Sequence, residues 1–307
     1  MSATDTTNTH GRTRLSFAKV ADIDEFVATL EKYERGEITP DQWRAFRLVR
    51  GTYGQRQSYD ASMLRVKIPQ GILDQKQLYA LAEAGEKYSR KFGHITTRQN
   101  IQFHFVKLHD IELAMRLLAD AGLTTREACG NSVRNITGCP YAGVSGSEVF
   151  DVTPYADGLT RFLLRHPLSA TLPRKFKIAF EGCAEDHIAL PINDLGFKAA
   201  IGPDGVRGFR VTAGGGTAIM CTNAGKLHDF IPAAEIPRVA EAILKVFRQF
   251  GDYQHKQRNR IKFMIKSLGW DRFVAEYERE LAAARDANVP LLEIDPPVEE
   301  TKLEGTR

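Results

Sequence analysis

The sequence predicts an α+β protein whose two halves differ in their patterns of apolar, polar and turn-forming residues. Between residues 62 and 122 the apolar residues recur first with period two and then with the helical period, which gives the order strand, helix, strand, helix. From residue 124 the chain is rich in turn-forming and polar residues before further strands and helices follow. With 307 residues, 43% of them hydrophobic and 26% charged, the chain can bury a sizeable core and has the composition of a globular protein.

Two helices are expected ahead of the first strand. Residues 22–36 form one and residues 39–51 the other. Thr39 is placed to cap the second helix, and Pro40 suits its first position. Residues 1–15 lack apolar periodicity and are expected to be disordered.

The strand-helix-strand-helix segment has clear boundaries. Pro69 stops the first strand, and Gly93 and Gly122 end the two helices. The second strand, "HITTRQNIQFHFV", is unusual because one of its faces carries Arg, Asn, Gln and His instead of apolar side chains. The four elements, with the helices on one sheet face, are residues 62–69, 73–93, 94–106 and 109–122.

The second half is expected to add further strands and helices. The helix at 236–251 is the best supported, because its apolar residues from Ile236 to Phe250 fall on one stripe. The other elements are a helix at 154–165, strands at 174–182, 187–202 and 205–216, and helices at 255–268 and 270–285. The chain thus divides into an N-terminal arm with two helices (1–48), a first half-domain (49–123), a second half-domain (124–251), and C-terminal helices with a loose tail (252–307).

Composition excludes several classes of protein. No apolar run approaches the roughly 18 residues of a membrane span, and the N-terminus lacks the apolar core of a secretory signal, so the cytoplasm is the expected compartment. The net charge of +4 fits an anionic small ligand at least as well as a polyanion. The cysteines form no C-x-x-C pair, so most of them are expected to be buried thiols rather than parts of a disulfide framework or a structural zinc site. They are Cys129, Cys139, Cys183 and Cys221.

Positively charged residues recur where the backbone would hold them in place. Three predicted strands carry cations on the face opposite their apolar residues, and a turn-rich loop adds another. Arginine can hold a carboxylate bidentately and lysine supplies a compact charge, so together they suit a ligand with several carboxylates plus a small oxyanion. The alternative is that these strand faces are exposed and charged for solubility. The cations are Arg65 and Lys67, Arg98, Arg134, and Lys175 and Lys177.

Four further features each allow more than one interpretation. His104 is either a proton donor or ligand, or a strand residue that makes hydrogen bonds. "AGGGT" (213–217) either lets a ligand approach the backbone or only turns the chain. "HKQRNRIK" (255–262) is either a solvated helix face or a nucleic-acid contact. Cys139 is a buried thiol, a reactive thiol or a metal ligand, and a single thiolate cannot build a cluster.

At these residues the chain resembles a known family, the siroheme-containing sulfite and nitrite reductases. The resemblance covers roughly residues 48–285, and its motifs occur in the order that the family has. They are "RGTYGQRQ" (50–57), "MLRVKIPQG" (63–71), "TTRQNIQFH" (96–104), "VRNITGCPYAG" (133–143), "LPRKFK" (172–177), "INDLGF" (192–197) and "GFRVTAGGG" (208–216).

The resemblance implies a ferredoxin-like half-domain followed by an α/β siroheme-binding half-domain. It implies reduction of sulfite to sulfide, or of nitrite to ammonia, by six electrons at siroheme. Lys177 favours sulfite, because nitrite-reducing members typically have asparagine there. The residues implied to hold the substrate are Arg65, Arg134, Lys175 and Lys177. The residues implied to bind siroheme are Lys67, Arg98, Gln102, His104, Asn135 and Arg174.

One feature of the family is missing. Its members bind a [4Fe–4S] cluster through cysteines spaced C-x5-C and C-x3-C in a second repeat, and neither spacing occurs here, so no metal ligand is expected in this chain. The leading interpretation is the N-terminal half of a reductase, inactive alone, that is either a subunit of a split enzyme or a truncated frame. Such a half would need two partners: a polypeptide that carries the cluster cysteines, and an electron donor, which is ferredoxin or a flavoprotein. Neither nucleic acid nor a membrane is expected as a partner. The alternatives are a non-catalytic module that binds siroheme or another tetrapyrrole, and a nucleic-acid-binding α/β module.

Overall fold

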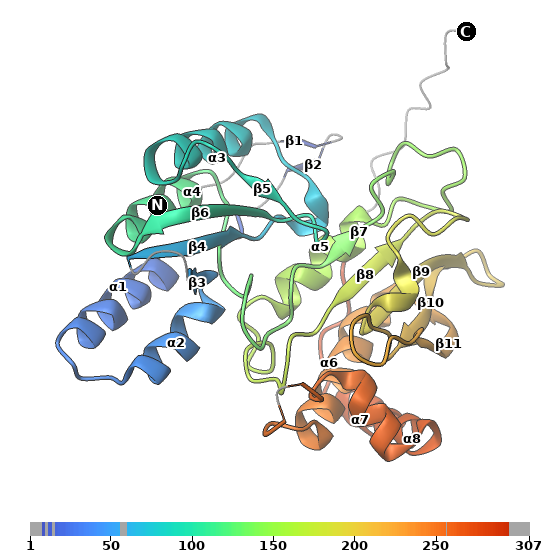
Figure 1. The fold of residues 1–307 in the computed structure, drawn as a ribbon. Coiled ribbons are helices and arrows are strands. Elements are labelled where there is room, and N and C mark those ends of the chain that lie inside the picture. The colour runs from blue at the N-terminus through green and yellow to red at the C-terminus, as the bar shows by residue number, and fades with distance from the viewer. Residues whose placement is uncertain (1–7, 10–11, 14–15, 56–59, 256, 295–307) are drawn as a thin grey trace, which may run out of the picture.

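The structure is a computed structural model that describes all residues except 1–7, 10–11, 14–15, 56–59, 256 and 295–307. Its described part holds a sheet of four strands and a sheet of five strands, which lie side by side in Figure 1, besides one short two-stranded hairpin. Each of the two larger sheets belongs to its own buried apolar cluster, together with helices. The predicted α+β class is therefore confirmed.

The first sheet has the order β3-β4-β6-β5, with every neighbouring pair antiparallel. Its strands are β3 (Thr52–Gly54), β4 (Ala61–Val66), β5 (His94–Ile95) and β6 (Ile101–Lys107). The predicted helices follow as α3 (Gln75–Tyr88) and α4 (Ile111–Asp120). Their apolar residues share one core with Leu64, Val66 and Phe103 of the strands. One face of this sheet is thus closed by helices, and the other is available for a site.

The prediction of one continuous strand over 94–106 is wrong, because the chain makes a hairpin there. A turn separates β5 from β6, and it is closed by hydrogen bonds from Thr96 N to Asn100 O and from Gln99 N to Thr96 O, both 2.9 Å. Gln99 takes a φ of 58°. The Thr96 hydroxyl also accepts from the backbone N–H groups of Arg98 and Asn100, a local bond that competes with sheet pairing. Arg98 therefore lies on a turn and not on a strand face.

The helices α1 (Val20–Glu34) and α2 (Pro40–Val49) precede the first sheet and share its core. Thr39 caps α2 as predicted, within a capping box completed by Gln42. The rings of Phe26 and Trp43 pack together across the two helices, 5.4 Å between centroids. Because the N-terminal helices and the sheet have a common core, a domain boundary after residue 48 stays a prediction.

Two predictions concern the ends of the chain. Within residues 1–15, expected to be disordered, β1 (Asn8–Thr9) pairs with β2 (Arg12–Thr13), and all other residues of this segment lie outside the described residues. The loose tail expected from Pro290 lies outside them from residue 295.

The second sheet has the order β11-β10-β9-β8-β7. Its strands are β7 (Thr137–Gly138), β8 (Ile178–Glu181), β9 (Leu195–Ile201), β10 (Arg207–Ala213) and β11 (Gly225–Pro232). The pairs β7–β8 and β8–β9 are parallel, whereas β9–β10 and β10–β11 are antiparallel. The sequence did not predict β7, which has two residues, or β11, which lacks a clear apolar alternation.

Within the described residues, the second half contains four helices. They are α5 (Thr153–Leu163), α6 (Ile236–Phe250), α7 (Ile261–Leu268) and α8 (Trp270–Asp286). The apolar stripe predicted for α6 is buried in the second core, which α7 and α8 also share. Four short 3-10 turns lie at Pro69–Gly71, Leu108–Asp110, Leu190–Ile192 and Ala233–Glu235. Among the described residues, no helix has the length and apolar character needed to cross a membrane.

The strand β8 is shorter than the predicted strand 174–182, and this changes the position of two lysines. Ahead of β8, Phe176 forms an isolated bridge with Val133. Lys175 and Lys177 flank this bridge residue, so they lie in an extended segment before the strand and not on it.

Candidate functional site

A cleft of about 980 Å³ lies between α2, the first sheet and loops of the second half. Its lining includes residues of α2 and β4, the segments 129–134 and 170–175, Tyr253 and Asn259. Among the described residues of this lining, Asp41 is the one acidic side chain. Such an excess of positive charge in a concave site attracts anions. The cations of the lining are Arg44, Arg47, Arg65, Arg134, Arg174 and Lys175.

Arg65 lines the cleft from β4, whereas its neighbours Leu64 and Val66 belong to the core. Gln102 is its partner in the sheet register, and Gln102 Oε1 accepts from Arg65 Nε (2.8 Å) and from Nη2. Arg65 Nη1 donates to the carbonyl of Ala128 at 3.3 Å. The guanidinium is therefore held in place by the sheet on one side and by the 128–134 loop on the other.

Arg134 is anchored to the same loop. Its Nε and Nη2 donate to the carbonyl of Gly130 (3.1 and 2.9 Å), and its Nη1 donates to that of Ala128 (3.4 Å). Burial lowers the pKa of Arg134 to about 10, and the nearby charge of Arg65 acts in the same direction. Two guanidinium groups that share the Ala128 carbonyl repel each other, and a bound anion would relieve that repulsion.

Lys175 and Lys177 are positioned by Phe176 between them. Phe176 N donates to Ser132 O (3.0 Å), and Phe176 O accepts from Arg134 N (2.8 Å), so this segment runs alongside the loop that carries Arg134. Burial, followed by the charges of neighbouring arginines, lowers the pKa of each lysine to about 8. An ammonium group that titrates near neutral pH can donate a proton there.

A buried ion pair behind these lysines was missed by the sequence analysis. Asp194 Oδ1 accepts from Arg260 Nε (3.0 Å) and Nη2 (2.7 Å), and Asp194 Oδ2 accepts from Lys177 N (2.7 Å). Burial raises the pKa of Asp194, and the charge of Arg260 opposes that rise. Asp194 belongs to the "INDLGF" motif and Arg260 to the basic run at 255–262. Both stretches were singled out in the sequence, but no sequence signal predicted that these two residues are in contact.

Some side chains of the basic run at 255–262 point into the protein and not into solvent. Asn259 and Lys262 are buried, and Lys262 Nζ donates to the carbonyls of Thr217 (2.6 Å) and Met220 (2.9 Å). Nucleic-acid binding needs cations that reach phosphates, so these inward side chains do not support that interpretation.

Arg98 and Asn135, both implied by the resemblance to bind the cofactor, connect the two halves of the chain. From the hairpin turn, Arg98 donates to Asn193 Oδ1 (2.8 Å) and to the carbonyls of Asn135 (2.6 Å) and Ile178 (2.8 Å). Asn135 Nδ2 donates in return to the carbonyl of Arg98 (2.9 Å). Burial lowers the pKa of Arg98 to about 10. Contact of these two residues with a cofactor stays a prediction.

Lys67, Lys177, Gln102 and His104 are also absent from the described lining of the cleft. Lys67 is buried, and burial lowers its pKa to about 8 against the opposing charge of Glu127. Gln102 Nε2 lies 3.1 Å from His94 Nδ1, and the same His94 nitrogen lies 3.4 Å from His104 Nε2. Burial and the neighbouring His94 lower the pKa of His104. The polar face of β6 is thus a hydrogen-bonded network that ends at Arg65.

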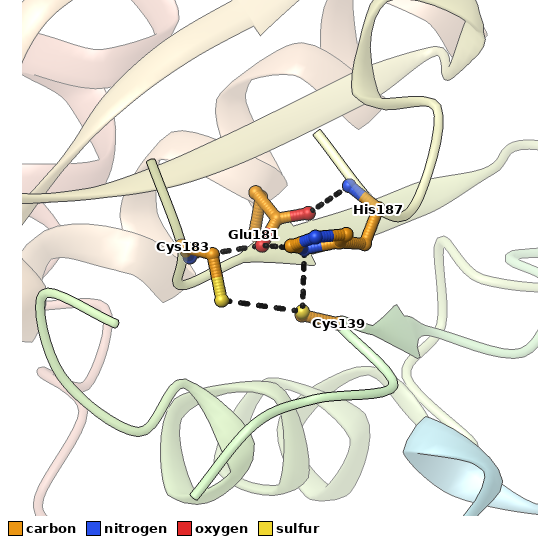
Figure 2. Close-up of side chains that lie close together, drawn as sticks. All are labelled: Cys139, Glu181, Cys183 and His187. Atoms are coloured by element: carbon orange, nitrogen blue, oxygen red, sulfur yellow. Dashed lines mark hydrogen bonds and ion pairs between the residues drawn. The ribbon is translucent and has the colours of Figure 1, made fainter. Parts of the chain in front are cut away.

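A second group of reactive side chains lies elsewhere in the second half. Cys139, Glu181, Cys183 and His187 point towards one another (Figure 2). Cys139 and Cys183 are both buried, as the sequence predicts for most of the cysteines. Their meeting was not predicted, because they are far apart along the chain, and the structure brings their two sulfur atoms to 3.7 Å.

The fold and the cleft define an α+β protein that gathers arginine and lysine side chains around a concave, positively charged cleft. Two family models match this chain: the nitrite/sulfite reductase ferredoxin-like half domain over residues 53–121, and the nitrite and sulphite reductase 4Fe-4S domain over residues 129–284. The chain belongs to the nitrite and sulphite reductase family. The ferredoxin-like identity of the first half is thereby confirmed.

Relatives of both substrate types are similar to this chain. A ferredoxin–nitrite reductase of Leptolyngbya laminosa is 36% identical over 250 residues, which are 80% of this chain and 49% of the relative. A sulfite reductase [ferredoxin] of Mycobacterium tuberculosis is 34% identical over 218 residues, which are 71% of this chain and 39% of the relative. The solved structure of the Mycobacterium tuberculosis NirA protein superposes with a TM-score of 0.73 at 29% identity, covering 90% of this chain and 55% of that one. The chain spans about half the length, or less, of the curated relatives it matches.

Proposed function

We propose that this chain forms the siroheme- and anion-binding half of a reductase that converts sulfite to sulfide or nitrite to ammonia. The observation that carries the proposal is the cleft, where Arg65, Arg134, Arg174 and Lys175 come together from separate parts of the sequence. All four belong to the motifs through which the chain resembles siroheme reductases. Membership of the family supports the same reaction class.

The residues of the cleft fit a cofactor with several carboxylates. Arg44, Arg47 and Arg174 add charge beyond what one small oxyanion needs. Arg47 Nε is buried and meets no hydrogen-bond partner among the described residues, so the side chain has a donor to offer. We assign these three arginines to the cofactor carboxylates, together with the family-implied Lys67, Arg98, Gln102, His104 and Asn135.

The four substrate residues divide into two roles. Arg65 and Arg134 are held by carbonyl and amide oxygens, so they neutralise a bound oxyanion in a fixed position. Lys175 and Lys177, with pKa values of about 8, deliver protons as the substrate oxygens leave as water. Siroheme, when bound, supplies the iron centre for the electron transfers. The presence of Lys177 favours sulfite as the substrate.

The cluster of the family is assigned to a second polypeptide or half. In this chain Cys139 and Cys183 lie together, Cys129 lines the cleft and Cys221 is exposed, so the four cysteines do not converge on one [4Fe–4S] cluster. The chain would therefore receive electrons through a partner that carries the C-x5-C and C-x3-C cysteines, with ferredoxin or a flavoprotein as donor.

The cofactor assignment is tested by the absorption spectrum of the chain purified from a siroheme-making host. Bound isobacteriochlorin bands are expected, and Arg47→Ala and Arg174→Ala should each reduce the bound cofactor, whereas Arg279→Ala, an exposed arginine of α8, should not. A colourless wild-type protein in the presence of its partner polypeptide would contradict the assignment.

The substrate assignment is tested by reconstitution with a polypeptide that carries both cysteine pairs. Arg134→Ala and Lys175→Ala should each lower kcat/KM by about 10²-fold or more, because each removes charge aimed at the reacting anion. Lys226→Ala, on the exposed surface of β11, is the matched control. Unchanged activity of the two cleft variants would refute the substrate assignment, and bound cofactor without turnover would favour the non-catalytic binding module.

A further inference from the structure

The group of Cys139, Glu181, Cys183 and His187 is built at one edge of the second sheet. Cys139 directly follows β7, Glu181 is the last residue of β8, and Cys183 and His187 lie on the loop after β8. Because β7 and β8 are parallel, their C-terminal ends meet at the same edge, where α/β sheets commonly bind ligands. The described lining of the cationic cleft includes none of the four residues. The group is therefore spatially separate from the cleft on which the proposed reductase function rests.

Hydrogen bonds of the backbone hold all four residues of this group in position. Cys139 N donates to Phe180 O (2.9 Å), which extends the β7–β8 pairing to the first cysteine. The carboxylate of Glu181 accepts from Cys183 N (2.9 Å) at Oε1 and from His187 N (2.7 Å) at Oε2. The loop is thus folded around the Glu181 carboxylate, and it returns His187 over the two thiols, as Figure 2 shows.

The distances between the four donor atoms are those of a site for one metal ion. Cys139 Sγ lies 3.7 Å from Cys183 Sγ and 3.6 Å from His187 Nδ1, and all four donor atoms lie within 4.8 Å of one another. Four-coordinate zinc has bonds of about 2.3 Å to sulfur and about 2.0 Å to nitrogen, so tetrahedral angles put two thiolates about 3.8 Å apart and a thiolate about 3.5 Å from an imidazole nitrogen. Glu181 Oε1 lies 3.8 Å from His187 Nδ1, and a small rotation of the carboxylate would complete the tetrahedron.

Burial adds a second reason for a cation at this position. Glu181 and Cys183 have no exposed surface and Cys139 is 4% exposed, while the His187 side chain is 26% exposed. A wholly buried carboxylate beside two thiols is unfavourable unless a positive charge compensates it. A divalent ion would supply that charge, and the partly exposed imidazole offers an entry path.

We propose that Cys139 Sγ, Cys183 Sγ, His187 Nδ1 and Glu181 Oε1 bind one Zn²⁺ ion as a closed, structural site. Two thiolates and one imidazole are the soft and borderline ligands that select zinc over magnesium or calcium. A [4Fe–4S] cluster would place each thiolate on a different iron atom and needs more cysteines than this group has. The ion fixes the 182–194 loop to the end of β7.

The position of that loop gives the site a role in the rest of the fold. The loop ends at Asn193 and Asp194, which bind Arg98 and Arg260 respectively. On the other side, Gly138, next to Cys139, exchanges two hydrogen bonds with the side chain of Gln99 from the hairpin turn. A metal ion between Cys139 and the loop therefore reinforces the junction of the two halves.

The test uses the full chain, purified under reducing conditions, with its metal content measured by plasma mass spectrometry. About one zinc ion per chain is expected, and Co²⁺ replacement should give the intense visible bands of a tetrahedral ion together with thiolate-to-cobalt charge transfer. Cys139→Ser and His187→Gln should lose the bound metal and the cobalt spectrum. Cys221→Ser and His109→Gln, which change an exposed cysteine and an exposed histidine, are the matched controls and should keep both.

Stability supplies a readout that needs no variant of the buried cysteines. A chelator should lower the Tm of the wild-type chain by several degrees and leave that of His187→Gln unchanged, because an ion that binds the folded state stabilises it. A reduced wild-type chain that retains no zinc and gives no tetrahedral cobalt spectrum would overturn the proposal. So would a Cys139–Cys183 disulfide that persists under these conditions, or iron and inorganic sulfide in place of zinc.

Discussion

At the scale of single residues, the candidate site is made of charges whose positions the backbone fixes. Arg65 and Arg134 both donate to the carbonyl of Ala128, and the peptide of Phe176 places Lys175 and Lys177 on either side of it. Burial lowers the pKa of both lysines and of Lys67. Each of these cations is more costly to bury than a neutral residue, so their burial lowers the stability of the fold.

The buried ammonium of Lys67 predicts a particular pH dependence of stability. Its pKa is 10.5 when unfolded and about 8 in the folded chain, so the unfolded state binds more protons between those values and the free energy of unfolding rises with pH across that window. Lys67→Met should remove up to about 3 kcal/mol of that rise. Urea unfolding at pH values spanning about 7.5 to 10.5 measures it. Lys226→Met, an exposed control, should keep the wild-type slope, and an equal slope in Lys67→Met would contradict the prediction.

The buried pair of Asp194 and Arg260 predicts that replacing one side-chain oxygen of Asp194 strongly lowers the free energy of unfolding. Asp194→Asn leaves the guanidinium of Arg260 buried without its counter-charge, which should cost about 3–5 kcal/mol in the free energy of unfolding. Denaturant unfolding of the variant is the measurement. Asp229→Asn removes an exposed partner of Lys226 and should leave stability unchanged. If the two variants were equally stable, the pair would not organise the loop before β9.

At the scale of elements, turns decide which residues of the first half contact the second half. The 94–106 segment has the alternation of one strand, yet its middle is a turn that delivers Arg98 to the second half. The triple glycine of "AGGGT" (213–217) also brings two parts of the chain together, because its backbone lies close to the backbone of residues 191–193. A Cβ on Gly215 would lie 2.0 Å from Pro191 O and 2.7 Å from Asn193 O. The end of β10 is therefore packed directly against the loop that carries Asp194.

Gly215→Ala tests this contact. The added methyl group must push the 191–193 backbone away, which should lower the free energy of unfolding by about 1–3 kcal/mol or more. Thermal unfolding of the variant measures the effect. Gly146→Ala is the control, because nothing lies within 4 Å of the Cβ it would add, and its Tm should stay near that of the wild type. A Gly215→Ala chain as stable as this control would show that the loop can move aside.

At the scale of the whole molecule, two apolar cores are joined by polar side chains. Arg98 contributes three hydrogen bonds across the junction, Asn135 donates to the carbonyls of Ile68 and Arg98, and the Gln99 amide pairs with Gly138. The cationic cleft lies at the same junction. The relative position of the two halves therefore determines both the stability of the chain and the shape of its site.

Arg98→Met is expected to weaken that junction. It removes the Arg98 donors from the side-chain oxygen of Asn193 and from the carbonyls of Asn135 and Ile178. Each lost hydrogen bond of a buried group costs about 1–3 kcal/mol, so the chain should lose about 3 kcal/mol or more and unfold in two separate steps. Calorimetry of the wild type, which should show one transition, is the comparison. Arg279→Met serves as the exposed control. A single unshifted transition in Arg98→Met would mean that the halves are joined chiefly by other contacts.

Much of the architecture was predictable because it depends on local patterns. The apolar stripe of α6, the Thr39 cap of α2 and the strand-helix-strand-helix order follow from periodicities and end signals within a few residues. Arg65 and Arg134 were predicted as cations on held backbone, and both line the cleft. The strands β7 and β11 were missed because pairing with neighbours, and not their own composition, makes them strands.

The sequence by itself determined the class of the fold, the family resemblance and the supply of cations. The tertiary structure decided which of these groups meet, since contacts such as Asp194 with Arg260, or Cys139 with Cys183, join residues far apart in the chain. The periodicity of apolar residues in the sequence does not predict such contacts. They form only when parallel strands bring their ends to one edge of a sheet and loops fold back over them. The same packing buries Lys67 and Arg98 and so lowers their pKa values, because the shift comes from desolvation and from neighbouring charges that only the folded chain brings together.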